Sequence, residues 1–113
     1  MKRNNNLMLI VYLAGFFEGR GCFSIRKDKK KYVQFKIKLS GYKDNYTIKH
    51  IENLLRELGI NYIIDSKGLL WITTRSQVKK FAEMLLPYMS IKKKEVSHFI
   101  DELNKYAFQS GSN

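Results

Sequence analysis

The chain has 113 residues and a strong basic excess, with 21 lysines and arginines against 10 aspartates and glutamates and a formal net charge of +11. This length suits one domain with one core, and so basic a composition favours a nucleic acid over acidic lipid or mere solubility as the reason for the charge. Cys22 is the only cysteine, which excludes an internal disulfide and favours an intracellular, reducing compartment.

The first predicted element is a helix from Leu7 to Arg20, with Asn6 as its N-cap and Gly21 as its stop. A basic pair precedes this apolar run, as in a secretory signal peptide, but no small-residue cleavage site follows it. The run is also shorter than the about 20 apolar residues that cross a bilayer. We therefore expect a buried or interfacial helix and no membrane partner.

Two strands are predicted next, because the apolar period changes to two. Apolar and polar residues alternate over residues 22–26 and again over residues 33–40, and a charged turn at residues 27–30 separates the two runs. Asp44 is the expected N-cap of a second amphipathic helix that ends at Gly59.

A second hairpin is predicted from residues 60–65 and 69–73, with a turn at Lys67 and Gly68. A third helix follows at once. Thr74 is its expected N-cap, with Gln77 as the partner in a capping box.

The third helix is expected to end at Pro87, and a final helix to begin near Ser90. We expect one domain over residues 1–108 and a disordered tail over residues 109–113. The order αββαββα plus a C-terminal helix predicts an α+β domain, in which helices cover one face of a four-stranded antiparallel sheet. A ferredoxin-like domain would give almost the same pattern, so the pattern alone does not choose between the two.

The first helix carries Gly15 and Gly19 four residues apart. A helical glycine costs about 1 kcal/mol relative to alanine, so two of them call for a reason. Together with Ala14 they clear one helix face for the close approach of another backbone. Close packing of this helix on its own sheet is the alternative.

Six polar side chains of the first two strands are expected to project from one face of the sheet. They are Ser24, Arg26, Gln34, Lys36, Lys38 and Ser40. A twisted antiparallel ribbon fits the major groove of DNA, where such side chains pair with base edges. A solvated face without a ligand is the alternative. Arg75 would position phosphates, whereas Trp71 could lie on either face and is given no role.

Residues 13–21 read LAGFFEGRG and resemble the signature motif of the LAGLIDADG homing endonucleases. The chain has one copy of the motif and is similar to single-motif members, in which two motif helices pair across a twofold axis. The resemblance therefore implies a homodimer whose open sheet faces form a saddle over a long pseudo-palindromic DNA duplex, cut with Mg²⁺. The expected interface residues are Leu13, Ala14, Gly15, Phe16 and Gly19.

The motif departs from the family at the position before its last glycine. Cleaving members carry an acid there that holds the divalent metal, and this chain carries Arg20. The resemblance also matches Lys92, after the turn of residues 86–88, to a lysine that reaches the cleavage centre, and the neighbouring Lys93 is the alternative match because this spacing varies. Arg20 and Lys92 are thus the expected residues of that centre. Glu18 and the backbone of Gly19 are the only nearby metal candidates, and we do not expect either to bind metal strongly.

Two functions follow from these features. The first is a homing-endonuclease-type protein that binds duplex DNA as a homodimer, with cleavage weakened by Arg20. The second keeps the binding surface without the cutting, as a maturase, a regulator or a binder of structured RNA. The intact remainder of the motif favours the first function, and Arg20 favours the second.

Overall fold

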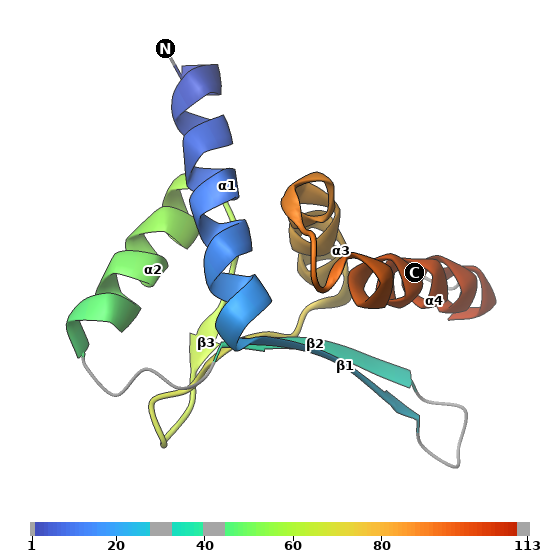
Figure 1. The fold of residues 1–113 in the computed structure, drawn as a ribbon. Helices are drawn as coiled ribbons and strands as arrows, with labels where there is room; N and C mark the ends of the chain where they lie inside the picture. The colour runs from blue at the N-terminus through green and yellow to red at the C-terminus, as the bar shows by residue number, and fades with distance from the viewer. Residues whose placement is uncertain (1, 28–32, 40–44, 111–113) are drawn as a thin grey trace.

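The computed structural model describes the backbone of residues 2–27, 33–39 and 45–110, and the side chains within these ranges except residues 2–5, 45 and 107–110. The expected α+β order is confirmed (Figure 1). The elements are α1 (Lys2–Arg20), β1 (Gly21–Lys27), β2 (Val33–Leu39), α2 (Asn45–Glu57), β3 (Ile63–Ile64), β4 (Leu70–Ile72), α3 (Arg75–Leu85), η1 (Leu86–Tyr88) and α4 (Lys93–Ser110).

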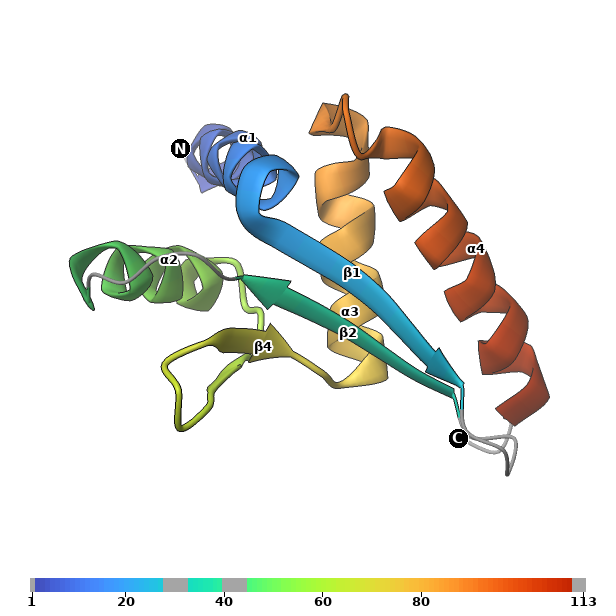
Figure 2. The ribbon, with the colours of Figure 1, turned by 60° about the horizontal axis from the view of Figure 1, so that its bottom comes forward.

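The four strands form one antiparallel sheet in the order β1-β2-β4-β3. The strands pair as two hairpins that meet through β2 and β4, and not as split βαβ units, so the ferredoxin-like alternative is excluded. Helices cover only one face of the sheet, and the other face is turned toward the viewer in Figure 2.

The core lies between the sheet and the helices. Phe17 of α1, Phe81 of α3 and Phe99 of α4 are among its largest buried side chains, and their rings pack edge to face against neighbours. The sheet contributes Phe35, whose ring meets that of Phe99 at 5.6 Å. Because apolar residues alternate along β1 and β2, the polar residues between them point away from this core.

Arg75 belongs to the helical side of the sheet and not to a phosphate-binding surface. Its guanidinium donates to the backbone carbonyl oxygen of Val33 at 2.9 Å and to that of Tyr106 at 3.5 Å. It also lies 5.5 Å from the ring centroid of Phe35, on the core face of β2. The prediction that Arg75 positions phosphates is therefore wrong, and the residue joins α3 to β2 and α4.

Several element ends differ from the expected ones. Helix α1 begins five residues earlier than Leu7, and α4 begins at Lys93 after the short helix η1. Thr74 makes no side-chain cap, and Gln77, its expected partner in a capping box, instead accepts the backbone N–H of Asn61 at 2.8 Å.

Other expectations on the ends of elements fall partly outside the described residues. Helix α4 reaches Ser110, into the expected tail, while residues 111–113 lie outside the described residues, as does Asp44. Over the described ranges, no helix combines the length and the apolar character needed to cross a membrane.

Candidate nucleic-acid interface

The strand register places the polar residues of β1 and β2 in rows on the open face. Arg26 pairs with Gln34, Ser24 pairs with Lys36, and Cys22 pairs with Lys38. Five of the six expected contact residues therefore lie on one face, and Ser40 lies outside the described residues. The hydroxyl of Ser24 donates to the backbone oxygen of Lys36 at 3.4 Å, which leaves the longer side chains as the main contact groups.

The open face is electropositive. Arg26, Lys36 and Lys38 lie on it. Ion pairs among the described residues join Lys27 to Glu102 and Arg56 to Glu52, and neither of them includes one of these three cations. A two-stranded ribbon with cations and an amide along it has the shape and the donors to read a major groove.

Trp71 lies at the centre of this face. It alternates with the fully buried Leu70 and Ile72 along β4 and pairs with Lys38 of β2 and Ile63 of β3. The ammonium nitrogens of Lys36 and Lys38 lie 5.5 and 5.4 Å from its ring centroid. A three-residue strand is too short for its alternation to assign faces, so the sequence alone does not predict the face of Trp71.

Asp65 fixes both the indole of Trp71 and the β3–β4 turn. Its Oδ2 accepts the indole N–H at 2.9 Å, and its Oδ1 accepts the backbone N–H groups of Lys67 and Leu69 at 2.9 and 3.0 Å. These bonds, led by that from Trp71, hold the pKa of the Asp65 carboxyl below its usual value. Gly68 closes the turn with a φ of 83°, which glycine adopts without strain.

The C-terminal end of α1 meets the start of α4 through Glu18. Its Oε2 accepts the backbone N–H groups of Ser90 and Lys92 at 2.7 and 2.9 Å, and its Oε1 accepts the Ser90 hydroxyl at 3.0 Å. A carboxylate is favoured there because it receives unpaired N–H groups just before a helix. Glu18 thereby fixes the backbone of Lys92 beside the end of α1 that carries Arg20.

The family resemblance implies a bound Mg²⁺ ion, but the side chains at this end of α1 are not suitable ligands for it. Magnesium takes carboxylate, phosphate and water oxygens. Arg20 supplies a cation, and both oxygens of Glu18 already accept hydrogen bonds. Within the described ranges, no group of three or more histidine, cysteine, aspartate or glutamate residues is arranged to hold a metal ion.

Glu18→Gln is expected to lower the stability of the fold near neutral pH and much less in acid. The hydrogen bonds, foremost that from the Lys92 backbone, lower the pKa of the Glu18 carboxyl, so the folded state favours the charged form. The charged Glu18 carboxylate stabilises the fold fully above the pKa that this carboxyl has in the unfolded chain. The stabilisation is lost as the pH falls through the lower pKa that the carboxyl has in the folded chain. Urea midpoints at about pH 7 and about pH 3 measure this difference. Glu57→Gln, at the exposed end of α2, is the matched control, and an equal Glu18→Gln effect at both pH values would contradict this role.

The exposed face of α1 includes both motif glycines. A Cβ added at Gly15 or Gly19 would meet no atom within 4 Å. By contrast, Leu13 and Ala14 are 0% and 1% exposed and belong to the chain's own core. The expectation that these two form a dimer surface is therefore corrected, because a helix turns them toward the sheet side. Phe16 is half-buried, between the two faces.

Apolar side chains extend the exposed face of α1 toward its N-terminus. They are Leu7, Met8, Val11 and Tyr12, with exposed fractions of 45 to 71%. Residues 7, 11, 15 and 19 are four apart and so follow one another along the helix. We call this surface, made of the two glycines and these four side chains, the glycine face.

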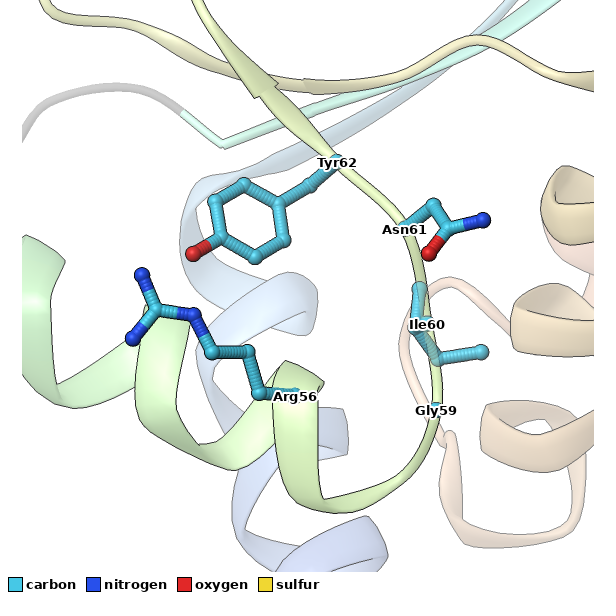
Figure 3. Close-up of a pocket in the computed structure, with 5 residues that line it drawn as sticks. All are labelled: Arg56, Gly59, Ile60, Asn61 and Tyr62. Carbon is cyan, nitrogen blue, oxygen red and sulfur yellow. The ribbon is translucent and has the colours of Figure 1, made fainter.

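A pocket of about 540 Å³ lies between the end of α2 and the segment before β3. Figure 3 shows that Arg56 and Tyr62 point toward one another there, and the guanidinium lies 5.9 Å from the ring centroid. The Tyr62 hydroxyl donates to Glu52 at 2.7 Å, and burial with this carboxylate raises the pKa of Tyr62. These groups satisfy one another, and we assign the pocket no ligand.

Comparisons with known proteins agree with this geometry. The model of the family described as LAGLIDADG endonuclease matches residues 13–110. The solved structures with similar folds include the homing endonuclease I-CvuI in complex with the I-CreI target, at 18% identity and a TM-score of 0.69 over 89% of this chain and 69% of that one. They also include I-TnaI, at 20% identity and a TM-score of 0.68 over 90% and 74% of the two chains.

The meganuclease I-AabMI, bound to uncleaved DNA, matches 92% of this chain at 22% identity and a TM-score of 0.71, and this chain spans 39% of its length. A comparison with curated proteins found no match. Identities this low show a shared fold, and the family match covers most of the sequence. The chain belongs to the LAGLIDADG endonuclease family.

Proposed function

We propose that this protein binds a long pseudo-palindromic DNA duplex as a homodimer of the homing-endonuclease type. The observation that carries the proposal is the open face of β1 and β2, where Arg26, Gln34, Lys36 and Lys38 project together without a covering helix. Structures of I-CvuI and I-AabMI are described as complexes with DNA, which supports duplex DNA as the partner.

The second subunit of this proposal would pack on the glycine face of α1. Gly15 and Gly19 leave this surface without a side chain, and exposed apolar groups continue it along the helix. Two such helices would approach closely and bury this apolar surface. The twofold axis would then place both open sheet faces on one side and give one saddle.

Cleavage by this chain is proposed to be very weak. Hydrolysis of a phosphodiester near neutral pH is assisted by a metal that activates water and stabilises the leaving oxygen. Arg20 and the hydrogen-bonded Glu18 offer no ligand set for it, although Arg20 and Lys92 could still contact phosphates. This observation favours a second candidate function, a non-cutting member that binds DNA or structured RNA as a maturase, regulator or structural component.

Duplex binding is expected to be tight and strongly dependent on salt. For the preferred duplex, selected from a randomised library, the dissociation constant should lie at or below about 10⁻⁸ M. Each neutralised phosphate adds about −0.9 to the slope of log K against log salt. Gel-shift titrations at several salt concentrations measure both quantities.

The control for this measurement is a structured RNA of the same length. Lys49→Gln, an exposed neutralisation on α2, should leave the duplex affinity unchanged, because α2 lies on the helical side of the sheet. Absence of binding to every duplex would remove the DNA proposal. RNA binding tighter than that of the selected duplex would favour the second candidate function.

A further inference from the structure

Trp71 is the chain's single tryptophan, and it occupies the middle of the surface proposed to bind DNA. Its half-exposed ring lies between the cations of β2 and the edge strand β3. A large aromatic side chain on an open sheet face exposes apolar area to water unless it serves a contact. Three charged side chains, those of Lys36, Lys38 and Asp65, lie against the ring of Trp71.

Two ammonium groups share the ring of Trp71. The nitrogens of Lys36 and Lys38 lie 5.5 and 5.4 Å from its centroid, within the range of cation–π attraction. Lysine side chains on a surface otherwise sample many rotamers, which weakens each hydrogen bond that they form. Contact with the ring restricts both lysine side chains before DNA binds. Less side-chain conformational entropy is then lost on binding.

The ring itself is held in place by Asp65. The 2.9 Å bond from the indole N–H to Oδ2 fixes the ring, and the two backbone bonds to Oδ1 fix Asp65 in the turn. The β3–β4 turn thus positions Asp65, Asp65 positions Trp71, and Trp71 positions the two lysines. Both ammonium groups are therefore held at one ring, close to the middle of the sheet.

The position of the pair favours base edges over phosphates as its target. Lys36 and Lys38 lie on β2, an inner strand of the four, whereas the edges of the sheet are β1 and β3. In the major groove, guanine presents two neighbouring acceptors, O6 and N7, and lysine is one of the side chains that pair with them. Adenine presents a donor beside its N7 and suits two ammonium groups less well.

We propose that Lys36, Lys38, Trp71 and Asp65 form a guanine-recognition element, in which the lysines contact base edges and Trp71 and Asp65 are positioning residues. This inference rests on the proposed function of the open face. It adds to that proposal a base preference and two residues that do not themselves touch the bases.

The first experiment tests the element without DNA. In the free protein, NMR should show the side-chain methylene protons of Lys36 and Lys38 shifted upfield by the ring current of Trp71. Trp71→Leu should abolish these shifts and Trp71→Phe should retain part of them, while a folded spectrum shows that each variant is intact. Asp65→Asn, which keeps the Oδ1 acceptor of the turn, should reduce them. Unshifted lysine resonances in the unaltered protein would overturn the positioning role.

The second experiment tests the base preference by selection from a randomised duplex library. The unaltered protein should prefer guanine at particular positions by about tenfold to a hundredfold. Trp71→Leu should relax the preference at those same positions, and Trp71→Phe should restore part of it. Gln34→Ala, in the row with Arg26, should relax different positions and serves as the matched control on the same face.

The outcomes of the selection separate the two proposals. If the unaltered protein selects no duplex, both the DNA proposal and the recognition element fail. If it selects a duplex but Trp71→Leu leaves the guanine positions unchanged, only the recognition element fails. If Lys36→Gln and Lys38→Gln weaken all sequences equally and reduce the salt slope, the lysines contact phosphates, and the guanine assignment is overturned.

Discussion

Arg20→Asp and Arg20→Glu are expected to give this protein Mg²⁺-dependent cutting of its preferred duplex, which the unaltered chain should lack. An acid at the end of α1 would supply the carboxylate oxygen that a hard cation takes, and the partner subunit would supply a second one. A bound metal contributes several kcal/mol to the transition state, so the gain should exceed about a hundredfold. Nicked and linear products from a supercoiled plasmid carrying the selected site measure it.

The matched control is Arg20→Asn, which removes the positive charge without adding a carboxylate. If only the acidic variants cut, a single residue accounts for the silent centre. If none of the variants cuts although all bind, the loss extends beyond residue 20 and favours a binding protein. Efficient cutting by the unaltered chain would show that another carboxylate reaches the axis, and our description of this end of α1 would be wrong.

Gly19→Leu is expected to convert the proposed homodimer into a folded monomer. Within one chain, a Cβ at Gly19 has no atom within 4 Å, so the larger side chain fits the isolated subunit. Between two subunits it would stand where the helices approach most closely. Loss of the second subunit removes one half-site, and duplex affinity should fall by about 10²- to 10⁴-fold. Light scattering gives the mass, and a gel shift gives the affinity.

The control for added surface hydrophobicity is Asp101→Leu, which also introduces a leucine, but at an exposed position of α4. It should leave both mass and affinity unchanged. A monomeric unaltered protein at micromolar concentration, with and without DNA, would contradict the homodimer. A Gly19→Leu variant that stays dimeric would place the interface elsewhere than on the glycine face.

The sequence predicted the parts of the fold in which periodicity is long enough to read. The strands β1 and β2 have seven residues each, and their alternation alone predicts that Arg26, Gln34, Lys36 and Lys38 share one face. Strand β4 has only three residues, so the same argument gave no face for Trp71. The face on which Trp71 lies is set by the pairing of β4 with β2. This contact joins segments that are distant in sequence, so a local pattern cannot predict it.

Side-chain hydrogen bonds between segments that are distant in sequence likewise cannot be predicted from local patterns. Gln77 has the spacing of a capping box, yet a backbone N–H sixteen residues away binds it instead. Glu18 and Ser90 are 72 residues apart, and nothing near either one in sequence predicts their bond. The motif glycines predicted a cleared helix face correctly, but only helix geometry in the folded chain turned Leu13 and Ala14 away from it.

The hydrogen bonds of Glu18 change what an acid within the motif can tell about activity. In this chain the Glu18 carboxylate joins the end of α1 to the start of α4, through the hydroxyl and backbone of Ser90 and the backbone of Lys92. That joint supports the fold whether or not DNA is cut. An acid at residue 18 is therefore no sign of a working nuclease, and a test of cutting has to be made at residue 20.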